Sequence, residues 1–187
     1  IYLADPTIFS DNGTYYLYGT SPLSNNGFWV YKSKDLQHWD GPAGAVDGYA
    51  LWGNTYGTKG FWAPQVFKYD GRYGMAYTAN EQIAIAWADS PLGPFVQDKP
   101  AMIPAKTKEI DPFIFFDDDG KKYMYHVRLI NGNRIYVAEM NDDMRSLKEE
   151  TARECISVNE DGWENTEKSK WGVSEGPTVV KIDGTYY

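Results

Sequence analysis

The sequence contains few of the residues on which many protein functions depend. Its 187 residues include one cysteine, Cys155, and two histidines, so an internal disulfide is excluded and no cluster of zinc ligands is visible. Basic residues are also scarce, with 18 Lys and Arg against 26 Asp and Glu and a net charge of −8. Because binding to phosphates requires a basic patch, we expect no nucleic-acid partner and no attachment to an anionic membrane surface.

Long apolar runs are absent as well. No segment approaches the roughly 20 apolar residues that a membrane-spanning helix needs. No signal sequence opens the chain at Ile1, although a chain given without its leader would also begin in this way. We expect a secreted or periplasmic monomer, with a cytoplasmic location as the alternative.

Aromatic residues and turn-forming residues are abundant. Aromatics make up 16% of the chain, with 7 Trp and 15 Tyr, alongside 18 glycines and 10 prolines. This mixture is typical of many short strands joined by tight turns, and also of surfaces on which flat rings stack against sugars.

One short phrase occurs four times along the chain, each time with a different residue beside its proline. The copies are ADPTIF at 4–9, WAPQVF at 62–67, IDPFIF at 110–115 and EGPTVV at 175–180. Each is followed by an Asn-Gly or Asp-Gly turn and an aromatic run, the strongest short-range signal for a β-hairpin. A third strand is expected in the first three repeats, at 27–33, 83–90 and 134–140, and a weaker fourth strand near Trp39, Phe95 and Lys148.

A phrase that recurs about every 50–65 residues, with up to four antiparallel strands per repeat, predicts an all-β propeller. A stacked β-solenoid is the alternative, although its repeats are usually shorter. The chain holds three repeats and the first hairpin of a fourth, whereas propellers close with about four to eight blades. We therefore expect residues 1–187 to be a single, incomplete β-propeller catalytic domain of a longer polypeptide.

Three of the four copies carry a carboxylate beside the proline: Asp5, Asp111 and Glu175. In a propeller the first strands of all blades begin at the same end of the axis, so these side chains would converge. Two carboxyls flanking a glycosidic bond can hydrolyse it, and a third anion favours the protonated form of a neighbour. Glu175 lies one position further from its proline than the two aspartates do.

These motifs, in this order, resemble those of glycoside hydrolase family 43. The resemblance implies a five-bladed β-propeller that cleaves arabinofuranosyl or xylosyl linkages of plant cell-wall polysaccharides with inversion. It implies that Asp5 is the general base, Asp111 the pKa modulator that also orients the acid, and Glu175 the general acid. Base and acid would lie roughly 6.5–9.5 Å apart. It implies no required cofactor, with a structural calcium ion on the axis of the complete protein.

Four further residues are candidates for substrate binding. Trp62 occupies the slot next to the axis and is predicted to be a sugar-stacking platform, the alternative being a plug of the core. Phe28 is a candidate for the rim of the pocket. His126 and Arg128 alternate with apolar neighbours along a strand, where Arg128 would bind a sugar hydroxyl or form an ordinary salt bridge. The acidic run 117–120 lacks the alternating spacing of a calcium loop, so we expect a solvated turn and no metal ligand.

A non-catalytic propeller that binds glycans or serves as a scaffold is the competing interpretation. Retention of an acid in three equivalent slots favours the enzyme, since a binding module does not need all three. A fructan-cleaving propeller is a further alternative, but such enzymes resemble an Asn-Asp-Pro-Asn motif that Ala4-Asp5-Pro6-Thr7 does not match.

Overall fold

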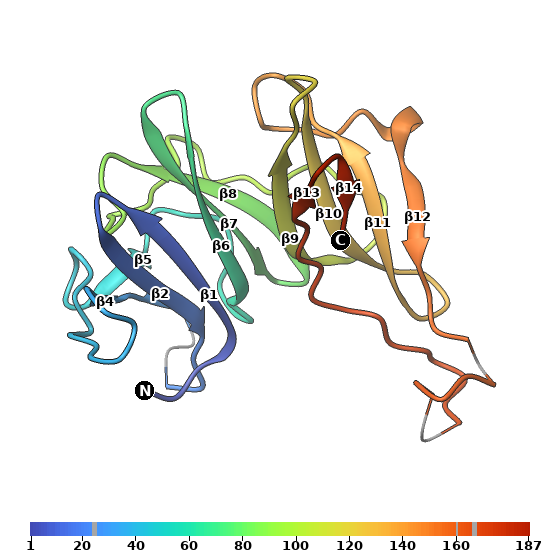
Figure 1. Ribbon diagram of the computed structural model, residues 1–187, viewed down its shortest axis with the longest axis horizontal. Coiled ribbons are helices and arrows are strands. Elements are labelled where there is room, and N and C mark those ends of the chain that lie inside the picture. The colour runs from blue at the N-terminus through green and yellow to red at the C-terminus, as the bar shows by residue number, and fades with distance from the viewer. Residues whose placement is uncertain (24–25, 160, 166–167) are drawn as a thin grey trace. The chain divides into compact units, whose positions relative to one another are not determined.

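The computed structural model describes residues 1–23, 26–159, 161–165 and 168–187 (Figure 1). The chain forms two compact units, residues 1–102 and residues 103–187. Each unit is described by itself below.

The first repeat opens the unit of residues 1–102 with an antiparallel hairpin. Strand β1 (Ala4–Asp11) pairs with β2 (Thr14–Thr20), and β2 pairs with the short strand β4 (Tyr31–Ser33). Asn12 and Gly13 connect β1 to β2 with φ angles of 48° and 67°. Two successive positive φ angles are typical of the tight turn that matches the twist of a hairpin, as the Asn-Gly pair predicts.

The third strand of this repeat is interrupted at Val30, although the sequence predicts one strand over 27–33. Strand β3 (Gly27–Trp29) leaves the sheet and pairs with β5 (Tyr49–Trp52), while β4 stays beside β2. Val30 and its neighbour Phe28 have no exposed surface, so burial of apolar side chains accompanies the interruption. The expected outer strand near Trp39 is reduced to one bridge between Lys32 and Asp40.

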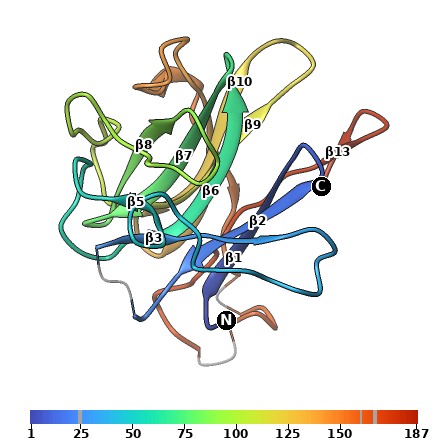
Figure 2. The same ribbon diagram turned by 90° about the vertical axis from the view of Figure 1, so that its left-hand side faces the viewer.

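The second repeat forms the sheet β6–β7–β8, whose strands lie side by side in both views (Figures 1 and 2). Its strands are β6 (Trp62–Tyr69), β7 (Arg72–Ala79) and β8 (Gln82–Ala88). The sheet packs on β1 and β2 through β6. The core of this unit is built from aromatic and small side chains, including Tyr18, Phe28, Leu51, Phe61, Met75 and Tyr77. The expected fourth strand near Phe95 is again a single bridge, Trp87 to Val96.

The third repeat, in residues 103–187, forms a four-stranded antiparallel sheet. Its order is β12–β11–β10–β9, with β9 (Glu109–Phe116), β10 (Lys122–Leu129), β11 (Asn133–Glu139) and β12 (Arg153–Ile156) (Figure 1). A 3-10 turn η1 (Glu149–Thr151) precedes β12, so the outer strand lies a few residues beyond the expected position near Lys148. The fourth repeat contributes the hairpin β13 (Lys181–Ile182) and β14 (Thr185–Tyr186).

These sheets confirm the all-β fold class and the four repeated hairpins. Within the part of the chain that the structure describes, no helix is long and apolar enough to cross a membrane.

The last hairpin is held to the third repeat by charged and aromatic groups. Lys181 Nζ lies 2.6 Å from Asp117 Oδ1 and 3.0 Å from Asp118 Oδ2, and the Tyr186 hydroxyl donates to Asp117 Oδ2. The side chain of Asp117 is 9% exposed. Hydrogen bonds from Lys181 and then Tyr186 lower the pKa of Asp117 from 3.8 to about 2.

We predict that Asp117→Asn destabilises the protein in a pH-dependent way. Because folding lowers the pKa of Asp117, its contribution to stability is complete above its ordinary pKa and is lost as the pH falls from about 4 towards about 2. In urea unfolding, the gap between wild type and variant should therefore close over that interval. Asp118→Asn, at a side chain that is 84% exposed, is the control and should have a small effect. A gap that is independent of pH would contradict the prediction.

Candidate active site

The residue directly before the repeated proline has a left-handed backbone in every copy of the phrase. The φ angles are 46° at Asp5, 44° at Ala63 and 54° at Asp111, and in the fourth copy 62° at Gly176. In the first three copies the strand pairing slips at this point, between Ala4 and Thr7, between Trp62 and Gln65, and on β9 between Ile110 and Phe113. The carboxylates Asp5 and Asp111 therefore occupy the same strained bulge in two different repeats.

This backbone conformation is costly for a residue with a side chain. A left-handed conformation costs an L-residue about 1–2 kcal/mol, and a following proline restricts its backbone further. Such strain persists where the surrounding structure imposes it, and it concentrates at functional sites. Glycine at position 176 avoids the cost, and the acid of the fourth copy stands one residue earlier, at Glu175. This explains why Glu175 is offset from the two aspartates.

Asp5 is held by a hydroxyl of the neighbouring strand. The Thr20 hydroxyl on β2 donates to Asp5 Oδ2 at 2.5 Å. The hydroxyl oxygen of Thr20 in turn accepts a hydrogen bond from the backbone N–H of Ala63 at 2.9 Å. One hydroxyl thus connects the bulge of the first repeat to the bulge of the second. Asp5 remains exposed, so its carboxylate is fixed in place without being removed from solvent.

Asp111 and Glu175 are brought together in the unit of residues 103–187. The backbone N–H of Gly176 donates to Asp111 Oδ2 at 3.1 Å, so Asp111 contacts the residue that follows the acid. Glu175 Oε1 accepts a hydrogen bond from the amide of Asn133, at the start of β11. Asp5 belongs to the other unit, and the separation of base and acid that the resemblance implies stays a prediction.

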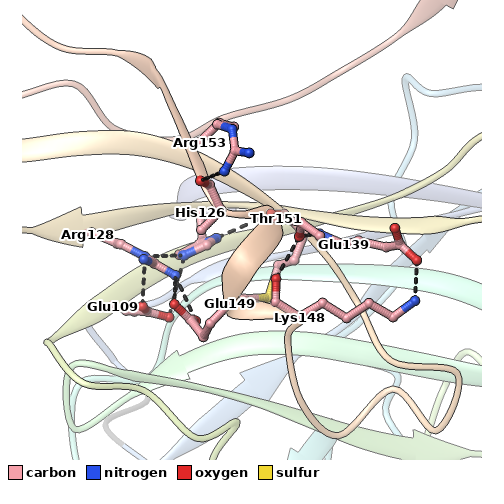
Figure 3. A network of polar contacts seen from close by, with 10 residues as sticks. Glu109, His126, Arg128, Glu139, Lys148, Glu149, Thr151 and Arg153 are labelled. Carbon is pink, nitrogen blue, oxygen red and sulfur yellow. Dashed lines mark hydrogen bonds and ion pairs between the residues drawn. The ribbon is translucent and has the colours of Figure 1, made fainter.

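A buried polar network fixes the start of β9, two residues before Asp111 (Figure 3). Arg128 Nε on β10 lies 3.0 Å from Glu109 Oε1, and its terminal nitrogen lies 2.9 Å from Glu149 Oε1. The same Nε lies 3.1 Å from His126 Nε2, which is also 3.5 Å from Glu109 Oε2, and Nδ1 of His126 faces the carbonyl of Met124 at 3.3 Å. The network therefore anchors β9 to β10 and η1.

The comparisons with known proteins agree on one family. The sequence pattern of Glycosyl hydrolases family 43 matches residues 2–187. The chain belongs to this family.

Three of the relatives that the chain matches are named as a xylosidase/arabinosidase, an endo-1,4-beta-xylanase and an endo-arabinase. A xylosidase/arabinosidase 43A from Humicola insolens is 30% identical in an alignment 209 residues long. The alignment covers 87% of this chain and 63% of that protein. An endo-1,4-beta-xylanase structure from Bacteroides thetaiotaomicron is 38% identical with a TM-score of 0.85, covering 98% of this chain and 61% of that one. An endo-arabinase structure from the same organism is 25% identical with a TM-score of 0.77, covering 98% of this chain and 67% of that one.

The match to these structures confirms the propeller fold class, of which the chain holds part. The chain spans less than two thirds of the length of the xylosidase/arabinosidase and of the endo-1,4-beta-xylanase.

The other candidates for substrate binding in this family-43 chain lie in different surroundings. Trp62 begins β6, is 39% exposed and lies against Gly60, where an added Cβ would approach the indole to 3.1 Å. A half-exposed indole at the strand start is compatible with sugar stacking, and its role as a platform stays a prediction.

Phe28 is not on the rim of a pocket, contrary to expectation. It has no exposed surface, and its ring packs edge-on against Phe61 and Tyr77 with centroids 5.9 and 5.8 Å away. Alternation along an aromatic strand does not show which face is solvated, and here the face of Phe28 is the core.

His126 and Arg128 also require correction. His126 has no exposed surface, and both its ring nitrogens face protein groups, so a direct contact with sugar is wrong for this residue. The side chain of Arg128 is 11% exposed, and its guanidinium pairs with two carboxylates and lies 5.0 Å from the centre of the Tyr136 ring. The salt-bridge alternative therefore describes Arg128.

Among the described residues, no three His, Cys, Asp or Glu side chains lie close enough to hold a metal ion. The structural calcium ion that the family resemblance implies for the complete protein stays a prediction. The acidic run 117–120 is a turn in which the Gly120 N–H donates to the Asp117 carbonyl at 3.0 Å.

Sequence reasoning missed three residues that hold the carboxylates or their strands: Thr20, Asn133 and Glu109. Thr20 ends the second strand of its repeat, directly opposite Ala4 in the pairing, so the hairpin register could have indicated it. Asn133 and Glu109 act through contacts between segments far apart in the sequence. No local pattern signals those contacts.

We predict that Ala63→Gly leaves stability unchanged or raises it by up to about 1.5 kcal/mol. Relief of a left-handed conformation, about 1–2 kcal/mol, should offset the entropic cost of glycine in a strand, about 0.5–1 kcal/mol. Ala4→Gly, in the same kind of strand but without a positive φ, is the matched control and should lose about 0.5–1 kcal/mol. Urea unfolding measures both variants, and equal losses would show that the bulge at Ala63 is unstrained.

Proposed function

We propose that the protein containing this chain hydrolyses arabinofuranosyl or xylosyl linkages of plant cell-wall polysaccharides or oligosaccharides, with inversion at the anomeric carbon. The observation that carries the proposal is the recurrence of a carboxylate at the strained bulge before the repeated proline, in a chain of family 43. Asp5 and Asp111 stand in that bulge, and Glu175 stands directly before Gly176, which has the same left-handed backbone in the fourth copy.

The roles follow from what two carboxyls can do at a glycosidic bond. The Asp5 carboxylate accepts a proton from a water molecule whose oxygen attacks the anomeric carbon. As the bond to the leaving oxygen breaks, Glu175 transfers its proton to that oxygen. Asp111 is bonded to the Gly176 N–H and therefore acts on the position of the acid, as the family resemblance implies. The exposed indole of Trp62 is proposed to stack on the sugar.

The named relatives support pentose polysaccharides as the substrate class, since they include a xylosidase/arabinosidase, an endo-1,4-beta-xylanase and an endo-arabinase. Their names divide between xylose and arabinose and between exo and endo action, so the proposal covers both sugars. Because such polymers are too large to enter cells intact, we propose a secreted or periplasmic protein. We further propose that it acts as a monomer and that a calcium ion, if bound, is structural.

The assignment predicts that Glu175→Gln and Asp5→Asn lose activity while remaining folded. Loss of a general acid or base costs about 10²- to 10⁴-fold in rate. The assay is nitrophenol release from arabinofuranoside and xyloside chromogens by the full-length protein, with proton NMR identifying the first-formed anomer. Asp89→Asn is the control, at a side chain that is 92% exposed. Wild-type rates in both variants, or a product with retained configuration, would refute the assignment.

A second prediction concerns Thr20. Thr20→Val removes the donor to Asp5 and the acceptor of the Ala63 N–H with little change in shape, so kcat should fall about 10-fold or more with little change in KM. Thr20→Ser keeps the hydroxyl and should restore most of the rate. A valine variant with the wild-type kcat, or a serine variant as slow as the valine variant, would contradict this role of the hydroxyl.

A further inference from the structure

Asn133 is buried, with 8% exposure, and lies where strand β11 meets the segment that leads to Glu175. Its backbone N–H donates to the carbonyl of Gly172 at 2.8 Å, and its carbonyl accepts the N–H of Ser174 at 2.9 Å. Gly132 permits this close approach, since a Cβ there would lie 2.8 Å from the Gly172 carbonyl oxygen. The backbone of Asn133 therefore fixes the path of the chain just before the acid.

The side chain of Asn133 continues from this backbone link to the acid itself. Its Oδ1 accepts the indole N–H of Trp171 at 2.8 Å, and its Nδ2 donates to Glu175 Oε1. An indole nitrogen can only donate, so it must face the oxygen of the amide. Trp171 thereby sets the orientation of the amide and directs its N–H₂ group towards Glu175.

This orientation has a consequence for a general acid. An N–H donor occupies Oε1 of Glu175, so a proton on that oxygen would oppose the donor, and the acidic proton belongs on Oε2. We propose that Asn133, oriented by Trp171, is a positioning residue that reserves Oε2 of Glu175 for the transferred proton. The inference rests on the proposed function, because it requires Glu175 to be the acid.

Protonation of the leaving group is the step that this role affects. A dinitrophenolate leaves without a proton, whereas a phenolate or a sugar alkoxide requires one. A residue that positions the acidic proton should therefore matter only for poor leaving groups. A residue that merely supports the fold should affect both kinds of substrate alike.

The test compares Asn133→Ala with wild type on aryl glycosides whose leaving groups range from dinitrophenol to phenol, using the full-length protein. We expect kcat to fall about 10- to 100-fold for the phenyl glycoside, part of the contribution of a general acid, and to change less than about 3-fold for the dinitrophenyl glycoside. KM should change little for either. Asn141→Ala is the matched control, because the amide of Asn141 donates to Ser146 Oγ at 2.8 Å in the turn that follows β11.

Two further variants keep the test decisive. Trp171→Phe retains a ring but removes the N–H that orients the amide, so it should show the same selective loss to a smaller extent, even if Asn133→Ala folds poorly. Equal losses on both substrates in either variant, or no loss in either, would overturn the inference. Glu175→Gln is assayed alongside. Full activity of Glu175→Gln on the phenyl glycoside would reject the proposed function itself. If Glu175→Gln lost activity while Asn133→Ala and Trp171→Phe kept the wild-type rates, only the role of Asn133 would be rejected.

Discussion

A left-handed residue directly before a proline is the constraint on which the proposed site depends. In the first three repeats the phrase places a bulge in the first strand, and the residue in the bulge is Asp5, Ala63 or Asp111. The residues on either side of the bulge form the paired strand, while the side chain at the bulged position differs from repeat to repeat. In the fourth copy glycine takes the left-handed position, and the acid stands one residue before it.

The neighbours of the proposed acid and base differ in kind from the interactions that hold the sheets together. The start of β9 is fixed by ion pairs, in which Arg128 joins Glu109 and Glu149. Asp5 and Glu175 are instead held by neutral groups, the Thr20 hydroxyl and the Asn133 amide. A neutral donor fixes the geometry of a carboxyl group without supplying a full charge that would oppose its protonation.

Local patterns predicted the hairpins because their signals are local. The Asn12-Gly13 turn needs only neighbouring residues, and the recurrence of the prolines predicted that Asp5 and Asp111 occupy equivalent positions. The burial of Phe28 could not be predicted, because it follows from packing against Phe61 and Tyr77 more than thirty residues away. The same reason applies to His126 and Arg128, whose partners become visible only when β9, β10 and η1 are in place.

The Thr20 hydroxyl also gives a direction to the hydrogen bonds between the first two repeats. A backbone N–H can only donate, so the bond from Ala63 uses the oxygen of Thr20 as an acceptor and commits its single proton to Asp5. Oδ2 of Asp5 is thus held as an acceptor, which favours Oδ1 over Oδ2 as the oxygen that would take a proton from water. An alanine that carries no chemistry of its own thereby selects, through its peptide group, the oxygen on which the base would receive its proton.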